Sequence, residues 1–412
     1  LFEAVFASCG YKASVLEKAT KDDIETGLKY INNDACYPSV IVAGQLVNAF
    51  ISGRCDPSNT SVMITQTGGG CRATNYIAFL RKALVQAGFP DVAVISLSMT
   101  GIEENPGFSV TPKLLHNLIR SCVLGDLLMT LSLRTRPYEL KKGESDRTLK
   151  MWIKKIHIIV ANNKLLPNFR KMINSIISDF DKIELSADIK PRVGIVGEIL
   201  VKFHPDANNN LIKVIESEGG EAIVPSLLDF FLYCLYNVRF RHEHLGMSAI
   251  TAGMLNTVAS LTEACRTYMR NALLKNPKFA GYAPVKIKDI AEKAEKILRL
   301  GHCTGEGWLL TGEMIELIEK NIPNIVCVQP FACLPNHVTG KGMIKAIRRK
   351  FEDANIVTVD YDPGASEVNQ LNRIKLMIEV AFEKLNKNTD AGEETEFILY
   401  PTNNRRNLPG LS

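Results

Sequence analysis

Three consecutive glycines and a cysteine, in the segment ITQTGGGCRATN (64–75), constrain the fold of this chain more than any other feature. Residues 61–65 are rich in strand-forming side chains, and apolar residues recur at helical spacing over residues 76–88. The segment therefore predicts a strand-to-helix turn that carries Cys71. Because glycine has no Cβ, backbone N–H groups in such a turn can approach a bound group closely. Turns of this kind at the carboxyl ends of parallel strands are where α/β folds bind ligands.

The glycine run matches the dinucleotide-binding pattern only formally, although Gly68, Gly70 and Ala73 obey G-x-G-x-x-A. That pattern also needs an acidic residue at the end of the following strand, and the predicted strand 92–97 is followed by Ser98. A phosphate-binding Walker loop would need Gly-Lys-Ser/Thr, which is missing here. We therefore expect a different ligand. A metal-free α/β domain whose glycine turn holds phosphate stays open as an alternative.

The rest of the chain predicts an α/β protein of two or three domains, because 412 residues exceed one ordinary domain and strand-like runs alternate with helical patterns. Residues 1–140 form the first predicted unit, an α/β domain with Cys36 and Cys71. Residues 141–300 combine a helical segment with a second α/β unit. Residues 301–412 form a carboxyl-terminal α/β unit with Cys333. In this last unit, as at the glycine turn, a strand ends in a glutamine and a cysteine follows.

Composition favours a protein without nucleic-acid or membrane partners. The net charge is only +5, from 49 basic and 44 acidic residues that are scattered along the chain. The longest apolar stretch, 222–238, contains Pro225, Asp229 and Asn237, so it predicts a buried helix. No signal peptide is visible, and we expect a cytoplasmic protein. The chain begins without a methionine, which suggests a piece of a longer chain.

The ten cysteines are too sparse for a disulfide scaffold and lack the C-x-x-C pairs of structural zinc sites. Iron–sulfur clusters are more permissive, because thiolates from separate loops can converge and N–H donors stabilise the cluster sulfurs. Cys36, Cys71 and Cys333 lie in predicted loops rich in Gly, Pro, Asn or Asp. Four other cysteines lie on apolar faces and are expected to be small buried hydrophobes: Cys122, Cys234, Cys265 and Cys327.

Five segments together resemble the acyl-CoA dehydratase activase-related proteins, in the region that follows the ATPase domains of those large proteins. They are NNDACYPSVIVAGQ (32–45), TQTGGGCRATNY (65–76), GEGWLLTGEM (305–314), QPFACLPNHVTGKGM (329–343) and DYDPGASEVNQLNRIKLM (360–377). The resemblance implies a relation to the subunits of 2-hydroxyacyl-CoA dehydratases and benzoyl-CoA reductases. It also implies their fold, which has two or three flavodoxin-like parallel-sheet domains with added helices.

The resemblance further implies a four-iron four-sulfur cluster held by three cysteines, and the cysteines in the matching motifs are Cys36, Cys71 and Cys333. The residues expected to surround the cofactor are Gln66, Gly68, Gly69, Gly70 and Gln329. In such systems an ATP-hydrolysing activase, as a domain or a subunit, delivers low-potential electrons, and the cluster passes them to an acyl-CoA substrate. We also expect a homo-oligomer or a part of a longer chain.

Two alternatives stay open at this point. The chain could be a non-catalytic electron-transfer or scaffold module of a larger assembly, and binding of acyl-CoA thioesters would count against that. A fourth thiolate, from Cys9 or Cys327, would make the cluster a pure electron carrier, whereas three thiolates leave one iron open to substrate or water. The residues that carry the catalytic chemistry are not identified by the sequence.

Overall fold

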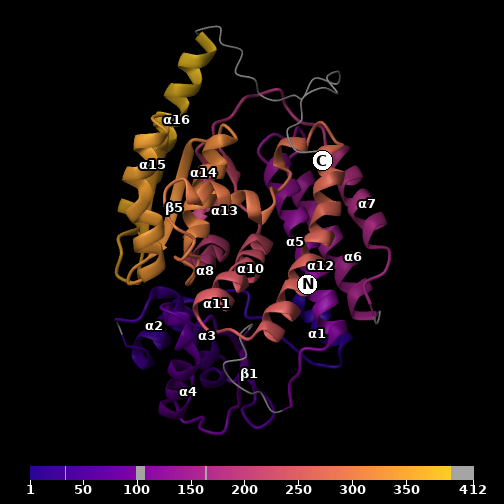
Figure 1. The fold of residues 1–412 in the computed structure, drawn as a ribbon, viewed down its shortest axis with the longest axis vertical. Helices are drawn as coiled ribbons and strands as arrows, with labels where there is room; N and C mark the ends of the chain where they lie inside the picture. The colour runs from indigo at the N-terminus through magenta and orange to yellow at the C-terminus, as the bar shows by residue number, and fades with distance from the viewer. Residues whose placement is uncertain (33, 99–106, 163–164, 391–412) are drawn as a thin grey trace.

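The computed structural model describes residues 1–32, 34–98, 107–162 and 165–390 and shows an α/β protein with two parallel sheets (Figure 1). The larger sheet has the order β4-β3-β5-β6, and all of its neighbouring strands are parallel. Its strands are β3 (Arg192–Gly197), β4 (Glu221–Ile223), β5 (Asn324–Pro330) and β6 (Asn355–Tyr361).

Counted along the chain, these strands lie in the order 2-1-3-4, which is the order of the first four strands of flavodoxin-like folds. The strand order reverses between β3 and β5, because β4 lies on one side of β3, whereas β5 and β6 lie on the other. Such a reversal opens a crevice at the carboxyl ends of the two strands, where open α/β sheets bind ligands. The two ends are Gly197 and Pro330.

Alternating side chains of the sheet pack against helices on its two faces. Val326 and Val328 of β5 belong to a core shared with α9 (Leu211–Ser217) and α16 (Glu367–Asp390). Ile325 and Cys327 belong to a second core, shared with α14 (Trp308–Glu319) and α15 (Ile344–Lys350). Both faces of the sheet are therefore covered, which explains why its strands are continuous apolar runs.

A bundle of helices packs beside the sheet around a separate apolar core, at the right of Figure 1. Its helices are α1 (Phe2–Ser8), α5 (Pro112–Thr135), α6 (Glu144–Asn162), α7 (Phe169–Asp181), α10 (Leu227–Tyr236), α12 (Ala249–Leu274) and α13 (Ile287–Glu295). Within the described residues α5 is the one helix long and apolar enough to cross a membrane, and 56% of its apolar window is buried in this structure. The buried helix predicted at 222–238 is confirmed over Leu227–Tyr236 as α10, which contributes to the same core, whereas Glu221–Ile223 form strand β4.

A smaller α/β unit lies below the sheet and the bundle in Figure 1. It contains α2 (Lys21–Tyr30), α3 (Tyr37–Ile51), α4 (Tyr76–Gln86) and a two-stranded parallel sheet of β1 (Val62–Thr65) and β2 (Val94–Leu97). Helices α2 and α3 touch through their backbones: a Cβ on Gly44 would lie 1.9 Å from the Asp23 carbonyl oxygen. Glycine is therefore required where these helices cross.

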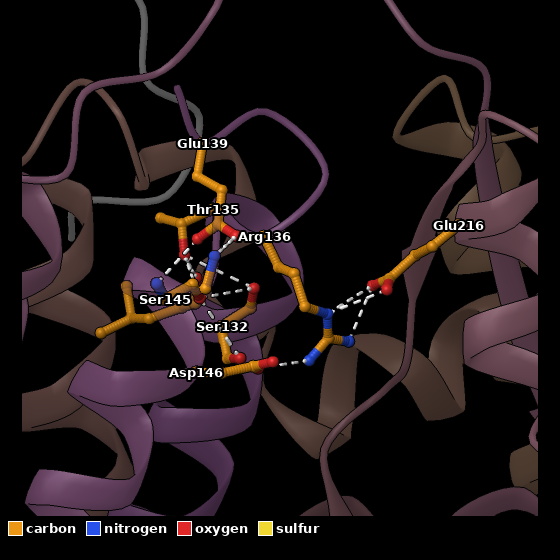
Figure 2. Close-up of polar contacts among 9 residues, drawn as sticks. Ser132, Thr135, Arg136, Glu139, Ser145, Asp146 and Glu216 are labelled. Atoms are coloured by element: carbon orange, nitrogen blue, oxygen red, sulfur yellow. Dashed lines mark hydrogen bonds and ion pairs between the residues drawn. The ribbon is translucent and has the colours of Figure 1, made fainter. Parts of the chain in front are cut away.

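A polar network ties the helical bundle to the larger sheet (Figure 2). Arg136, at the end of α5, donates to both carboxylate oxygens of Glu216 on α9, at 2.7 and 2.8 Å, and to Asp146 of α6 at 3.2 Å. Beneath it the hydroxyls of Thr135 and Ser145 share a buried hydrogen bond of 2.8 Å. Two-pronged arginine–carboxylate pairs fix geometry as well as charge, so this network sets how the bundle meets the sheet.

The structure confirms the α/β class and most of the predicted elements, with some corrections. Strand β3 ends at Gly197, because Glu198 caps a short helix, α8 (Ile199–Phe203). The loop predicted after β5 contains a helical turn over Asn336–Gly340. Strands β3 and β4, which precede residue 300, and strands β5 and β6, which follow it, join one sheet.

Candidate functional site

The glycine turn follows β1 and is closed by Gln66. Gly68 and Gly69 have φ angles of +77° and +73°, in the region that glycine adopts freely. The Gln66 amide donates to the Thr74 carbonyl at 2.8 Å and accepts from the Ser96 hydroxyl at 2.8 Å. Gln66 therefore holds the two ends of the turn together against β2. The predicted strand-to-helix turn is present, with a short 3-10 segment at Arg72–Thr74 before α4.

Cys71 caps that 3-10 segment, and its sulfur accepts from the Ala73 N–H at 3.5 Å. The loop 304–307, which precedes α14, packs against it. A Cβ on Gly305 would lie 3.6 Å from the Cys71 sulfur and 2.7 Å from the Pro335 ring. Gly305 thus lies between the turn that carries Cys71 and the loop that carries Cys333, at a spot with no room for a side chain.

Cys36 and Cys333 reach the same region from other elements. Cys36 begins α3, is buried, and lies 3.0 Å from the Tyr76 hydroxyl at the start of α4. Cys333 is buried in the loop after β5, at the switch point of the larger sheet. The residue before it, Ala332, has a φ of +60°, which is uncommon for a residue with a Cβ and is often found at functional sites.

The charge of Cys71 interacts with those of both Cys36 and Cys333. Burial raises the pKa of Cys71 to about 12, with further contributions from the negative charges of Glu306 and Cys36. Burial also raises the pKa of Cys333, helped by Glu306, Glu198 and Cys71. The pKa of Cys36 is raised by burial and by Glu198. The structure therefore brings together the three cysteines predicted from the sequence, although 297 residue numbers separate the first from the last.

Two buried carboxyl groups, Glu198 and Glu306, adjoin the thiols and were not identified from the sequence. Glu198 accepts from the Val201 N–H at 2.8 Å, and Glu306 accepts from the Ile199 N–H at 3.0 Å. Burial raises the pKa of both, and the charge of Glu306 raises that of Glu198 further. The sequence feature that could have identified Glu306 was the GEGW segment that contains it. The feature that could have identified Glu198 was its position, an acidic residue directly after a buried strand.

A buried ion pair lies next to these two carboxyl groups. Lys202 of α8 donates to both oxygens of Glu313 on α14, at 3.0 and 3.1 Å, and both side chains are 2% exposed. The positive charge of Lys202 lowers the pKa of Glu198 and Glu306 and partly offsets the effect of burial. The site thus holds buried carboxyl groups beside thiols.

Gln329 is the penultimate residue of β5, next to the switch point, and is fully buried. Its amide nitrogen donates to Asp360 of β6, while its amide oxygen has no hydrogen-bond partner among the described residues. A buried acceptor without a donor costs free energy unless a bound group or water supplies one. Of the two predicted glutamines, Gln66 is therefore fully engaged in shaping the turn and Gln329 retains an open acceptor.

The structure does not bring Cys327 or Cys9 to the three thiols. Cys327 points from β5 into the core against α15, and its nearest polar neighbour is Asn336, at 3.9 Å. Cys9 lies at the end of α1 beside Ser8, in the helical bundle. In the described part of the chain no interaction joins either thiol to Cys36, Cys71 or Cys333, so neither is placed as a fourth ligand.

Within the described ranges, no three His, Cys, Asp or Glu side chains are grouped closely enough to hold one metal ion. A cubane cluster imposes a different requirement, because each thiolate binds a different iron atom and the ligands stand farther apart than those of a single ion. Thiols from three separate loops, with a glycine turn beside them, are the kind of donor set that such a cluster takes.

No protein-family model matches the chain, and no curated protein sequence does.

Proposed function

We propose that this chain is an iron–sulfur protein of the 2-hydroxyacyl-CoA dehydratase and benzoyl-CoA reductase type, with a fold related to the subunits of those enzymes. Cys36, Cys71 and Cys333 hold one four-iron four-sulfur cluster. The protein receives low-potential electrons from an ATP-hydrolysing activase and passes them to an acyl-CoA or a similarly poorly reducible substrate. The observation that carries the proposal is that Gly305 lies against both the Cys71 sulfur and the loop of Cys333, with the charge of Cys36 acting on Cys71, beside the switch point of the larger sheet.

Each protein group has a stated task in this proposal. The raised thiol pKa values describe the metal-free chain, and iron would deprotonate the thiols, as metals do with coordinating cysteines. The turn at 68–70 offers N–H donors for cluster sulfurs. Glu198 and Glu306 place buried carboxyl groups with raised pKa values next to the site. When bound, the cluster would supply one-electron chemistry at low potential.

Three protein thiolates favour a reaction centre over a simple relay, because they leave one iron to be coordinated by substrate or water. The electron-transfer module stays as the second candidate. The two are separated by paramagnetic resonance of the reduced protein with and without acyl-CoA thioesters. A spectrum that changes on adding the thioester supports the reaction centre, and an unchanged spectrum together with no thioester binding supports the relay.

The proposal is tested by purification without oxygen, followed by iron and sulfide analysis. We expect a brown protein with about four irons and four sulfides per chain. Each of three single variants should lose most of the iron and most of the sulfide: Cys36→Ser, Cys71→Ser and Cys333→Ser. Cys55→Ser and Cys265→Ser serve as matched controls, since both thiols are partly exposed and lie away from the three-cysteine site. A colourless, iron-free protein that also fails to take up a cluster on reconstitution would refute the proposal.

A further inference from the structure

The larger sheet ends at β6, whose outer edge has no strand beside it in the described part of the chain. An edge strand presents unpaired N–H and C=O groups, and proteins usually cover or block such edges. Here one edge carbonyl is satisfied by a side chain, since Arg348 donates to the Ile356 oxygen at 2.5 Å. The edge is otherwise flanked by two helices, α15 on one face of the sheet and α16 on the other.

An open groove runs along this edge between the two helices. Ile356, Val357 and Thr358 of β6 form its floor, and α15 and α16 form its walls. The charged side chains that line it are all basic: Lys341, Lys345, Arg348, Arg349 and Arg373. A groove of this charge, next to unpaired backbone groups, fits an extended acidic peptide segment that adds a strand to the sheet.

The topology indicates where that segment comes from. Strands in the order 2-1-3-4 lack the fifth strand of the flavodoxin-like order 2-1-3-4-5, which lies parallel to the fourth strand and follows it through a helix. β6 is the fourth strand and α16 is the helix that follows it. A right-handed crossover from β6 through α16 would return the chain to the open edge of β6.

The sequence after α16 has the composition that this position requires. Residues 393–400, which lie outside the described part of the chain, are Glu-Glu-Thr-Glu-Phe-Ile-Leu-Tyr, an acidic stretch followed by strand-forming apolar residues. The acidic stretch matches the basic groove, and the apolar residues match its floor of Ile356 and Val357.

The length of the connection agrees with this placement. α16 runs antiparallel to β6, since Gln370 bonds to the Asp360 carbonyl and the Met377 carbonyl accepts from Asn355 at the start of β6. Asp390, the last residue of α16, therefore lies about 20 Å beyond the start of β6, at roughly 1.5 Å per residue. Six extended residues span about 20 Å, so residue 397 would reach the start of β6.

We propose that residues 397–400 bind in the groove as a fifth parallel strand beside β6, with Glu393, Glu394 and Glu396 meeting the basic side chains at the groove entrance. Arg348 and Arg349 lie in the last turn of α15, at the amino end of β6, where the acidic stretch arrives. The inference concerns the sheet edge and does not depend on the iron–sulfur proposal.

Hydrogen–deuterium exchange of β6 in the full-length chain tests this pairing. The triple variant Glu393→Lys, Glu394→Lys, Glu396→Lys should speed exchange of the edge amides of Asn355–Tyr361 by about tenfold, because like charges then meet at the entrance. Adding Lys345→Glu and Arg349→Glu should restore slow exchange. A control variant with the same change of net charge, Glu17→Lys, Glu25→Lys, Glu295→Lys, alters exposed acids elsewhere and should leave β6 unchanged.

Two results would overturn the inference. The first is β6 exchange that is the same in the wild-type chain, in the triple variant and in a chain that ends at Asp390. The second result uses the shortened chain, to which a synthetic peptide of residues 391–402 or an unrelated acidic peptide is added. If both peptides slow the exchange of β6 equally well, the groove belongs to a separate partner. Strong salt dependence of the protection would support the charge pairing.

Discussion

At the scale of single residues, the site depends on glycines as much as on cysteines. Gly307 has a φ of +45° and lies where the loop 304–307 turns into α14. A Cβ there would lie 2.1 Å from the His302 carbonyl oxygen and 2.4 Å from the Tyr233 hydroxyl. This loop fills the space between the turn of Cys71 and the loop of Cys333. The three thiols can therefore meet only if the backbone keeps this conformation at Gly307.

Gly307→Ala should consequently lower both the thermal stability and the iron content of the purified protein. A residue with a Cβ held in so sparsely populated a backbone conformation costs about 1–3 kcal/mol, and the two steric overlaps add to this. Gly246→Ala is the matched control, because Gly246 also has a positive φ but no atom within 4 Å of the added Cβ. Thermal unfolding and iron analysis of both variants provide the check. Equal losses in the two variants would mean that the packing around Gly307 has no special role.

The residues of the site were predictable to different degrees. Cys36, Cys71 and Cys333 stand in loops with small and polar neighbours, and the resemblance of the motifs around them named them as the expected ligands. Glu198 and Glu306 were missed because a sequence does not show that a charged residue is buried, and acidic residues rarely are. The free acceptor of Gln329 was equally invisible, since it depends on which groups of β6 lie beside it.

At the scale of elements, the short helix α8 and the helix α14 are joined by the buried pair of Lys202 and Glu313. The two helices position Glu198 and Glu306, because Glu198 caps α8 and Glu306 directly precedes α14. The sequence predicted neither of these two helices. It did not predict that strands on either side of residue 300 join one sheet, because pairing between distant strands leaves no local pattern.

Glu313→Gln should destabilise the protein by about 3–5 kcal/mol, because it leaves the Lys202 ammonium buried without a counter-charge. The double variant Lys202→Met, Glu313→Leu should recover most of this loss, since it removes both charges and fills the space with apolar groups. The exposed pair of Lys288 and Glu292, with side chains 70% and 59% exposed, is the control, and Glu292→Gln should cost less than about 1 kcal/mol.

Urea unfolding followed by circular dichroism measures these differences as shifts of the transition midpoint. Comparable shifts for Glu313→Gln and Glu292→Gln would show that the buried pair does not hold α8 against α14. A double variant that is less stable than Glu313→Gln would show that this position needs the charged pair itself. The loss in Glu313→Gln would then not come from an unpaired Lys202 charge.

At the scale of the whole molecule, the site lies where separate parts of the structure meet (Figure 1). Cys36 and Cys71 belong to the small α/β unit, Cys333 follows the larger sheet, and Glu306 precedes the helix that packs against both the sheet and the bundle. A cluster bound by all three thiolates would link the small unit to the larger sheet through the metal. Metal binding of this kind contributes directly to the stability of the parts that it joins.

Removal of iron by a chelator under anaerobic conditions should therefore loosen the junction and leave the bundle intact. We expect hydrogen exchange to become about tenfold faster or more in residues 66–76, 303–307 and 331–336. Helices α5 and α7 should be unaffected, because their apolar core contains none of the three thiols. The variant Cys333→Ser should already show the fast exchange before chelation. Uniform loosening of the whole chain, or no change at the junction, would mean that the three cysteines do not share a metal centre.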